Sequence, residues 1–173
     1  MDLYEDRGYD RTTVAEIAER AGLTERTFFR HYADKREVLF GGSADLRQSL
    51  VREVEGAPDS FSPLEATAAG LRAAGADLQE RRGRDFARRR QGILDRNPEL
   101  QERELIKMAS WAAAVAEALR RRGVGDLTAS LVAEVGVAAF RVAFEGWVAA
   151  DNRRDLPDLI RESFERLREL AAA

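Results

Sequence analysis

The chain has 173 residues, of which 45% are apolar and 34% charged, and its formal net charge is −3. A chain of this size buries roughly 70% of its unfolded surface, enough for a substantial core without disulfides or a metal. With no cysteine and a single histidine, His31, disulfide scaffolds, thiolate metal sites and cysteine nucleophiles are excluded, and little room is left for a zinc enzyme or a Ser–His pair. We therefore expect no cofactor, no metal site and no enzyme. Abundant Ala, Arg, Leu and Glu with only 4 prolines predict an all-α protein.

The distribution of charge says more than its total. The segment Met1–Asp10 is acidic and has no apolar stretch, so we expect no signal peptide and a cytoplasmic location. Residues 1–45 hold 7 Lys and Arg against 10 Asp and Glu, which argues against nucleic-acid binding by bulk charge. Within them, residues 20–36 hold five basic side chains against two acidic ones. A DNA-binding face requires only such a local patch, although an ordinary mixed surface has the same composition.

Two short helices are predicted inside this basic window. Thr13 and Glu16 match a capping box, in which each side chain accepts a hydrogen bond from the other residue's amide. Gly22 suits the left-handed position that ends the first helix, and Thr24 is the expected cap of the second. The connection Gly22-Leu23-Thr24 has the length of the turn in a helix-turn-helix.

The core side of this motif follows from helical spacing. Ala18 fits the crossing of the two helices, because a larger side chain would push them apart. Phe28 and Tyr32, four residues apart, are expected to face the core, with Leu23 buried beside them.

The outer side of the second helix then carries the side chains that could read DNA, namely Glu25, Arg26, Thr27, Phe29, Arg30 and His31. Arginines suit guanine edges or phosphates, and Thr27 suits a phosphate or a thymine methyl group. Lys35 would add an ammonium group for a phosphate at the start of the next helix. Two alternatives stay open: Phe29 is half-buried, or His31 makes only a local hydrogen bond.

The motif runs without interruption as GYDRTTVAEIAERAGL (Gly8–Leu23) followed by TERTFFRHYADKREVL (Thr24–Leu39). These 32 residues resemble the DNA-binding module of TetR-type transcriptional regulators. The resemblance implies an all-α homodimer with an N-terminal three-helix DNA-binding module and a C-terminal helical domain for ligand binding and dimerisation. By position it assigns to the DNA surface Thr13, Glu25, Arg26, Thr27, Phe29, Arg30, His31 and Lys35. Only Met1–Arg7 precede the motif, fewer residues than family members usually have there. An N-terminal helix this short would give less core support to the DNA-reading helix that begins after Thr24.

Beyond the motif, the boundaries depend on glycine and proline. Gly41-Gly42 interrupts a helical pattern, which indicates either a lever between two domains or a simple turn. We therefore expect a DNA-binding domain over residues 1–42 and a ligand-binding and dimerisation domain over residues 43–173. Ser62 and Pro63 predict a helix start after a linker. Further helices are expected near Leu64–Arg82, Asp85–Arg96, Pro98–Arg122, Leu127–Ala150 and Leu156–Leu170.

Six arginines fall within ten residues, at Arg81, Arg82, Arg84, Arg88, Arg89 and Arg90. Such a run most often forms a solvated helix face. The alternative is a site for an acidic ligand, such as an acyl-carboxylate or a phosphate-bearing thioester.

The segment Leu131–Ala150 is apolar nearly all round, with 15 of its 20 residues Ala, Val, Leu, Phe or Trp. Its charged residues Glu134, Arg141 and Glu145 argue against a membrane span. A helix of this kind must be covered on most sides, and we expect a second subunit to supply part of the cover. The predicted dimer interface comprises the small-residue stripe and the last helix, namely Gly136, Ala139, Ala143, Gly146, Leu159, Ile160, Phe164 and Leu167. The alternative is that the apolar residues of both helices pack within one subunit.

These expectations combine into a ligand-responsive transcriptional regulator. It would act as a repressor, bind a near-palindromic double-stranded operator as a homodimer, and be released by a small apolar effector without involving a membrane. The expected ligand pocket is lined by Met108, Trp111, Phe140, Phe144 and Trp147, although these are core candidates first. The alternative function is an all-α small-molecule-binding or interaction protein whose helix-turn-helix does not bind DNA.

Overall fold

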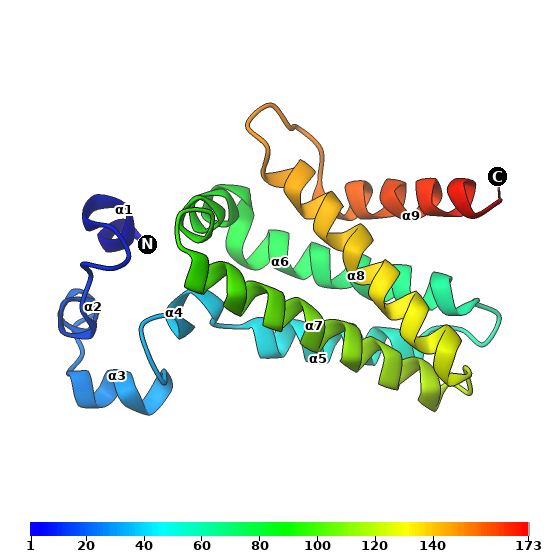
Figure 1. Cartoon of the computed structure of the whole chain (residues 1–173), viewed down its shortest axis with the longest axis horizontal. Coiled ribbons are helices and arrows are strands. Elements are labelled where there is room, and N and C mark those ends of the chain that lie inside the picture. The colour runs from blue at the N-terminus through cyan, green and yellow to red at the C-terminus, as the bar shows by residue number, and fades with distance from the viewer. Residues whose placement is uncertain (173) are drawn as a thin grey trace.

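The computed structural model describes residues 1–172, and within them the chain is all-α. Figure 1 shows the short N-terminal helices at one end of an elongated molecule and the long helices bundled at the other. The helices are α1 (Asp2–Arg7), α2 (Val14–Arg20), α3 (Glu25–His31), α4 (Glu37–Phe40), α5 (Ser43–Gly56), α6 (Pro63–Leu94), α7 (Pro98–Arg121), α8 (Asp126–Val148) and α9 (Leu156–Ala172).

The ends of the short helices follow the predicted local signals. Thr13 and Glu16 form both bonds of the capping box at the start of α2, and the Thr24 hydroxyl accepts from the amide of Thr27 at the start of α3. Gly22 adopts the left-handed conformation, with φ 68°. The α2–turn–α3 unit is therefore held by hydrogen bonds within a few residues.

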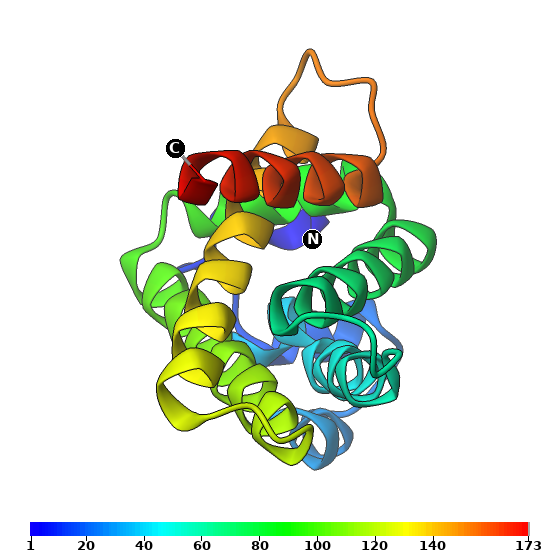
Figure 2. The same ribbon diagram turned by 90° about the vertical axis from the view of Figure 1, so that its right-hand side faces the viewer.

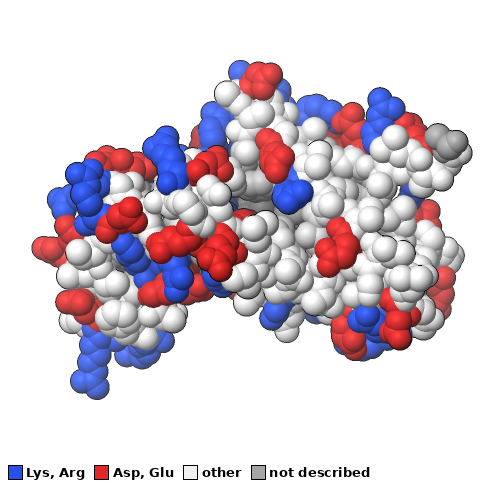
Figure 3. Space-filling model, in the orientation of Figure 1, with Lys and Arg blue, Asp and Glu red and all other residues white. Residues whose placement is uncertain are grey.

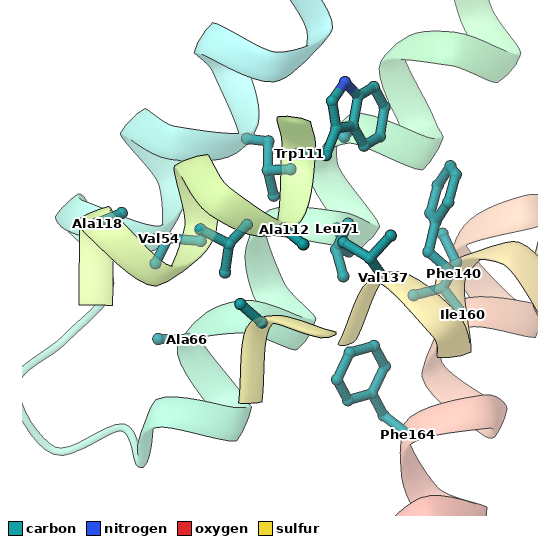
Figure 4. Close-up of a cluster of buried hydrophobic side chains, with 14 of the residues drawn as sticks. Val54, Ala66, Leu71, Trp111, Ala112, Ala118, Val137, Phe140, Ile160 and Phe164 are labelled. Carbon is teal, nitrogen blue, oxygen red and sulfur yellow. The ribbon is translucent and has the colours of Figure 1, made fainter. Parts of the chain in front are cut away.

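The long helices share one hydrophobic core. Figure 2 shows α5 to α8 arranged around a common centre, with α9 lying across one side of it. Side chains from all five helices meet there, and Figure 4 shows Val54, Leu71, Val137 and Phe164 converging from four of them. Apolar burial in this cluster is the main stabilising contribution to the bundle.

One glycine allows α6 and α8 to pack closely. A Cβ atom on Gly136 would lie 2.6 Å from Cγ2 of Thr67 in α6. The Thr67 side chain is fully buried and donates its hydroxyl hydrogen to the Pro63 carbonyl oxygen at 2.9 Å, so it has little freedom to move aside. Gly136 thus serves packing inside the subunit.

Helix α6 bends at Gly83, where φ is 74° and the backbone leaves the helical region. The break lies between the two helices expected near Leu64–Arg82 and Asp85–Arg96. Gly42 adopts a left-handed conformation as well and separates α4 from α5. Both breaks lie near the N-terminal helices. Gly42 follows α4 in sequence, and Gly83 precedes the second half of α6, which passes beside α4 (Figure 1).

A second apolar cluster joins the N-terminal helices to the bundle. It is built by buried side chains from α1 and the following turn, from α4, and from the α6–α7 corner, namely Tyr4, Tyr9, Leu39, Phe40, Ile93, Leu94 and Leu100. The Tyr4 hydroxyl also donates to the Lys35 carbonyl oxygen at 2.7 Å. The short helix α1 therefore takes part in the contact between the two halves of the molecule.

Helix α8 is long and apolar enough to cross a bilayer by length and composition alone, a test that core helices of soluble proteins also pass. In the structure it packs against α6, α7 and α9. Its charged side chains Glu134, Arg141 and Glu145 are exposed. This combination is typical of a bundle helix with one uncovered face.

Candidate DNA-reading helix and ligand cavity

Helix α3 presents most of the predicted DNA-contacting side chains to solvent. Phe28 is only 2% exposed and fixes one face of the helix in the core, beside the half-buried Tyr32. Phe29 on the other face is 53% exposed, which excludes the half-buried alternative for this side chain. The remaining members lie around the same outer surface, with Thr27 half-buried and the others exposed, namely Glu25, Arg26, Arg30 and His31.

Among the described residues, the arginine side chains of α3 lack the ion pairs that other arginines of the N-terminal helices form. Within residues 1–172 neither Arg26 nor Arg30 forms an ion pair, whereas Arg36 pairs with Asp34 at 2.5 Å. Figure 3 shows basic side chains projecting beyond the α3 end of the molecule. Free guanidinium groups on an exposed helix face can donate to phosphates or to guanine edges.

Two expectations for the motif need correction. Leu23 is 43% exposed and not buried, because Ala18 and Phe28 already fill the helix crossing. Lys35 does not extend into solvent: its Nζ donates to the carbonyl oxygens of Tyr9, Asp10 and Thr12 at 2.8, 3.1 and 3.1 Å. Lys35 thus uses its three N–H groups to hold the α1–α2 turn. Thr13 is exposed, and its hydroxyl is shared with Glu16 in the capping box.

A cavity of about 270 Å³ lies between α4, α5, α6, α7 and α8. Four of the five predicted pocket residues line it: Met108, Trp111, Phe140 and Phe144. Trp147 does not line the cavity, because it is packed behind Phe144 with the ring centroids 5.8 Å apart. The Gly41-Gly42 connection forms part of the wall, so the cavity borders the junction between the N-terminal helices and the bundle.

A charged cluster forms the α4 end of this cavity. Glu104 accepts from Arg90 at 2.6 Å through one oxygen and from Lys107 at 2.6 Å through the other. The Phe40 ring lies beside three cations, with the Arg90, Arg103 and Lys107 head groups 4.8, 4.7 and 5.9 Å from its centroid. Such cation–π contacts are stronger when they are desolvated. The cluster therefore ties the last residue of α4 to α6 and α7.

Burial and neighbouring charge shift the ionisation of this cluster. Burial is the largest cause that lowers the pKa of Lys107, and with the nearby charge of Arg90 it brings the pKa to about 8 against the opposing effect of Glu104. Burial alone raises the pKa of Glu104, but Lys107 and Arg90 together bring it below the usual glutamate value. Glu104 is accordingly ionised at neutral pH, and Lys107 is an unusually weak base.

The arginine run on α6 is neither a plain solvated face nor a single ligand site. Arg89 pairs with Asp2 and Glu5 of α1. The others mostly reach backbone carbonyl oxygens or nearby acids: Arg81 pairs with Asp77, Arg82 donates to Gly41, Arg84 to Asn152, Arg88 to Val148 and Ala149, and Arg90 to Leu39. Three of the six thus connect α6 with the N-terminal helices.

The predicted dimer stripe lies mostly inside the subunit. The side chains of Ala143, Ile160 and Phe164 are buried in the subunit's own core, as is Gly136. Ala139, Leu159 and Leu167 are half-buried, and only Gly146 is exposed. The orientation assigned to α8 was therefore wrong by about one position along the helix.

A different stripe of α8 remains uncovered. Leu131 and Val142 are 57% and 60% exposed, and they belong to a row of apolar side chains along one face, namely Leu127, Leu131, Val135, Ala138 and Val142. In Figure 3 the surface over α7 and α8 is largely without charge. Contiguous exposed apolar surface of this kind marks an interaction site.

Sequence reasoning missed the cluster at the α4 end of the cavity. Lys107 lies one helical turn before Trp111 and Glu104 two turns before it, so spacing alone could have placed all three on one face of α7. Their contacts with Phe40 and Arg90 involve other helices and have no local signal.

Comparison with known proteins agrees with this architecture. Residues 1–40 match the family model described as "Bacterial regulatory proteins, tetR family", and residues 61–172 match that of the "MftR C-terminal domain". The chain is 25% identical to the mycofactocin biosynthesis transcriptional regulator MftR of Mycobacterium tuberculosis over 155 residues, covering 88% of this chain and 77% of that protein. It is 36% identical to the transcriptional regulator TcmR of Streptomyces glaucescens over 73 residues, but these span 42% of this chain and only 32% of TcmR.

Solved structures share the fold. A TetR-family protein from Mesorhizobium loti has 21% identity and a TM-score of 0.61, with 99% of this chain and 90% of that chain covered. FadR from Thermus thermophilus, a TetR-family repressor solved with lauroyl-CoA, has 23% identity and a TM-score of 0.55 over 98% and 89% of the two chains. The family models account for both ends of the molecule, and their family consists of regulators and not enzymes. The chain belongs to the TetR family of bacterial transcriptional regulators and carries a C-terminal domain of the MftR type.

Proposed function

We propose that this protein is a homodimeric repressor that binds a near-palindromic operator and is released by a small, largely apolar effector. Residues 1–42 form the DNA-binding unit in this account, and residues 43–173 bind the effector and the second subunit. A protein with this role works in the cytoplasm, where chromosomal DNA is found.

The exposed face of α3 supports the DNA-binding part of the proposal. Arg26 and Arg30 lie one turn apart, and neither guanidinium group forms an ion pair with the part of the chain that the structure describes. The exposed ring of Phe29 lies between them in sequence. This face combines donors for phosphates and base edges with an apolar group for sugars or thymine methyls. Lys35 contributes by holding the α1–α2 turn.

The position of the cavity is the observation that carries effector control. The Gly41-Gly42 connection lines the cavity, and Arg82 from its α6 wall donates to the Gly41 carbonyl oxygen at 3.0 Å. A ligand that moves this wall acts directly on the connection to α3 and α4. A tenfold change in operator affinity requires only about 1.4 kcal/mol of differential binding.

The cavity wall supports an apolar effector with a polar end. Trp111, Phe140 and Phe144 supply aromatic surface, whereas charged groups gather at the α4 end. The structural neighbour FadR was solved with lauroyl-CoA, which shows that a related fold accommodates an acyl chain.

The exposed stripe of α8 supports a homodimer. We assign the interface to the row containing Leu131, Val135 and Val142, flanked by the exposed or half-buried positions of α9, in place of the stripe buried in the subunit. Two copies of this surface, related by a twofold axis, would form a four-helix interface.

Fluorescence anisotropy tests the DNA-binding part with DNA from upstream of the protein's own gene and a scrambled control at two salt concentrations. We expect a preference of roughly 10³ or more for the specific DNA and weaker binding at higher salt. Two results together would contradict operator binding: equal and weak binding to the upstream DNA and to the scrambled control, and no tighter binding to sequences selected from a random library. They would favour a protein that binds small molecules alone.

A further inference from the structure

We propose that the effector carries one carboxylate at the end of an apolar body, and that Lys107 pairs with this carboxylate at the α4 end of the cavity. This inference deepens the proposed effector binding and rests on it. It names the chemical class of the ligand and the residue that selects it.

Charge counting in the cluster points to a missing anion. Arg90 and Lys107 share the single carboxylate of Glu104, and their side chains are only 11% and 13% exposed. The neighbouring Arg103 is balanced by Glu37 of α4 at 2.8 Å. Three cations thus face two carboxylates around Phe40. Buried charge is costly unless it is paired, so a surplus cation at the wall of a cavity favours an anionic ligand there.

Among the three cations of the cluster, Lys107 makes the fewest hydrogen bonds within residues 1–172. Its ammonium group carries three N–H bonds, and Glu104 accepts one of them. The nearest aromatic rings, Trp111 and Phe40, are 5.7 and 5.9 Å from Nζ and accept no conventional hydrogen bond. Arg90, by contrast, is also held by the Leu39 carbonyl oxygen at 2.7 Å. A ligand carboxylate would complete the coordination of Lys107 without breaking the bond between α6 and α4.

The remaining walls favour an apolar body of moderate length. Met108, Trp111, Phe140 and Phe144 extend from Lys107 along α7 and α8. The volume of about 270 Å³ lies just below the roughly 300–1,000 Å³ of typical small-molecule sites, which favours a small ligand. The other charges on the wall add up to zero, since Arg81 pairs with Asp77, Arg141 pairs with Glu145, and the negative charge of Asp45 offsets the positive charge of Arg82. A medium-chain fatty acid fits both the size and the distribution of charge.

The weak basicity of Lys107 gives the proposal a pH signature. The charged groups that face it are Arg90 from α6, Glu104 and Arg103 from α7, and Glu37 beyond Arg103 from α4. In the protein without a ligand, Lys107 loses its proton near pH 8. A ligand carboxylate beside it would stabilise the protonated form. Carboxylate binding is therefore strongest below pH 8 and weakens as the pH rises past it.

Isothermal titration calorimetry without DNA tests this selection, with decanoate and decanol as probes of equal chain length. At pH 7 we expect decanoate to bind at least about tenfold more tightly than decanol, which corresponds to about 1.4 kcal/mol. In Lys107→Met the two probes should bind within about threefold of each other, because only the charge is removed from a side chain of similar length. Arg84→Met is the matched control, since Arg84 lies on α6 but bonds to Asn152 outside the cavity.

Three results would overturn the proposal: equal binding of the two probes to the unmodified protein, an unchanged preference in Lys107→Met, or no decanoate binding up to about 1 mM. If Lys107→Met does not fold, the unmodified protein at pH 7 and pH 9.5 decides the question, because only decanoate affinity should fall at the higher pH. Since no DNA is present, a failure of operator binding would leave these results unaffected and would count against the regulator instead.

Discussion

Arg90 of α6 donates a hydrogen bond from Nε to the carbonyl oxygen of Leu39 in α4, at 2.7 Å and across 51 residues of chain. The same guanidinium group pairs with Glu104 of α7 and lies over the ring of Phe40. One nearly buried side chain thus links α4, at the end of the DNA-binding motif, with the α6 and α7 walls of the cavity. Through this link, a ligand in the cavity can act on α4.

Replacing Arg90 with methionine should weaken the contact between α4 and the bundle. The Leu39 carbonyl oxygen would lose its donor and Glu104 one of two cations, so we expect a loss of about 2–4 kcal/mol in the free energy of unfolding. Urea denaturation followed by circular dichroism measures it. Arg84→Met, on the same helix but bonded to the α8–α9 loop, should cost less than half as much. Equal costs would show that the Arg90 link has no special importance.

Replacing Arg30 with alanine should weaken operator binding and leave folding and assembly unchanged. Arg30 is exposed on α3 without an ion pair among the described residues, and we expect a loss of about 1–3 kcal/mol in operator affinity. Anisotropy titrations measure the loss, with Arg52→Ala on the exposed side of α5 as control. A loss well below this range would remove Arg30 from the DNA-reading surface.

Two neighbouring substitutions on α8 distinguish the dimer surface from the core. Val142→Arg places a charge on the exposed stripe and should give folded monomers. Ala143→Arg should instead destabilise the subunit, since Ala143 is 3% exposed within it. Sedimentation equilibrium gives the mass and circular dichroism the helix content. A dimeric Val142→Arg variant would place the interface elsewhere.

The sequence was informative where a signal is local. The capping box of Thr13 and Glu16 and the left-handed turn at Gly22 depend on residues within a few positions, and both were predicted correctly. The orientation of α8 was not, because a helix with 15 apolar residues in 20 has no clear apolar face by periodicity. The arginine run was ambiguous for a different reason: its partners on α1, on α4 and at Gly41 lie 41 to 87 positions away.

The close contact of α6 and α8 predicts opposite effects for two glycine substitutions. Gly136→Ala should lower the free energy of unfolding by about 1–3 kcal/mol, because its Cβ would lie 2.6 Å from Thr67 Cγ2. Gly92→Ala, in α6 with no neighbouring atom within 4 Å of its Cβ position, should raise it by about 0.5–1 kcal/mol. Urea denaturation compares the two. A neutral Gly136→Ala would mean that the helices are not packed this closely.

Selection from a random double-stranded DNA library tests whether a dimer reads two half-sites with α3. We predict enrichment of a near-palindromic sequence whose half-sites are spaced by about one helical turn of DNA or a multiple of it. The Arg30→Ala variant should enrich the same sequence poorly or lose its preference at individual positions. Recovery of no common sequence by the unmodified protein at low salt would contradict operator reading by a dimer.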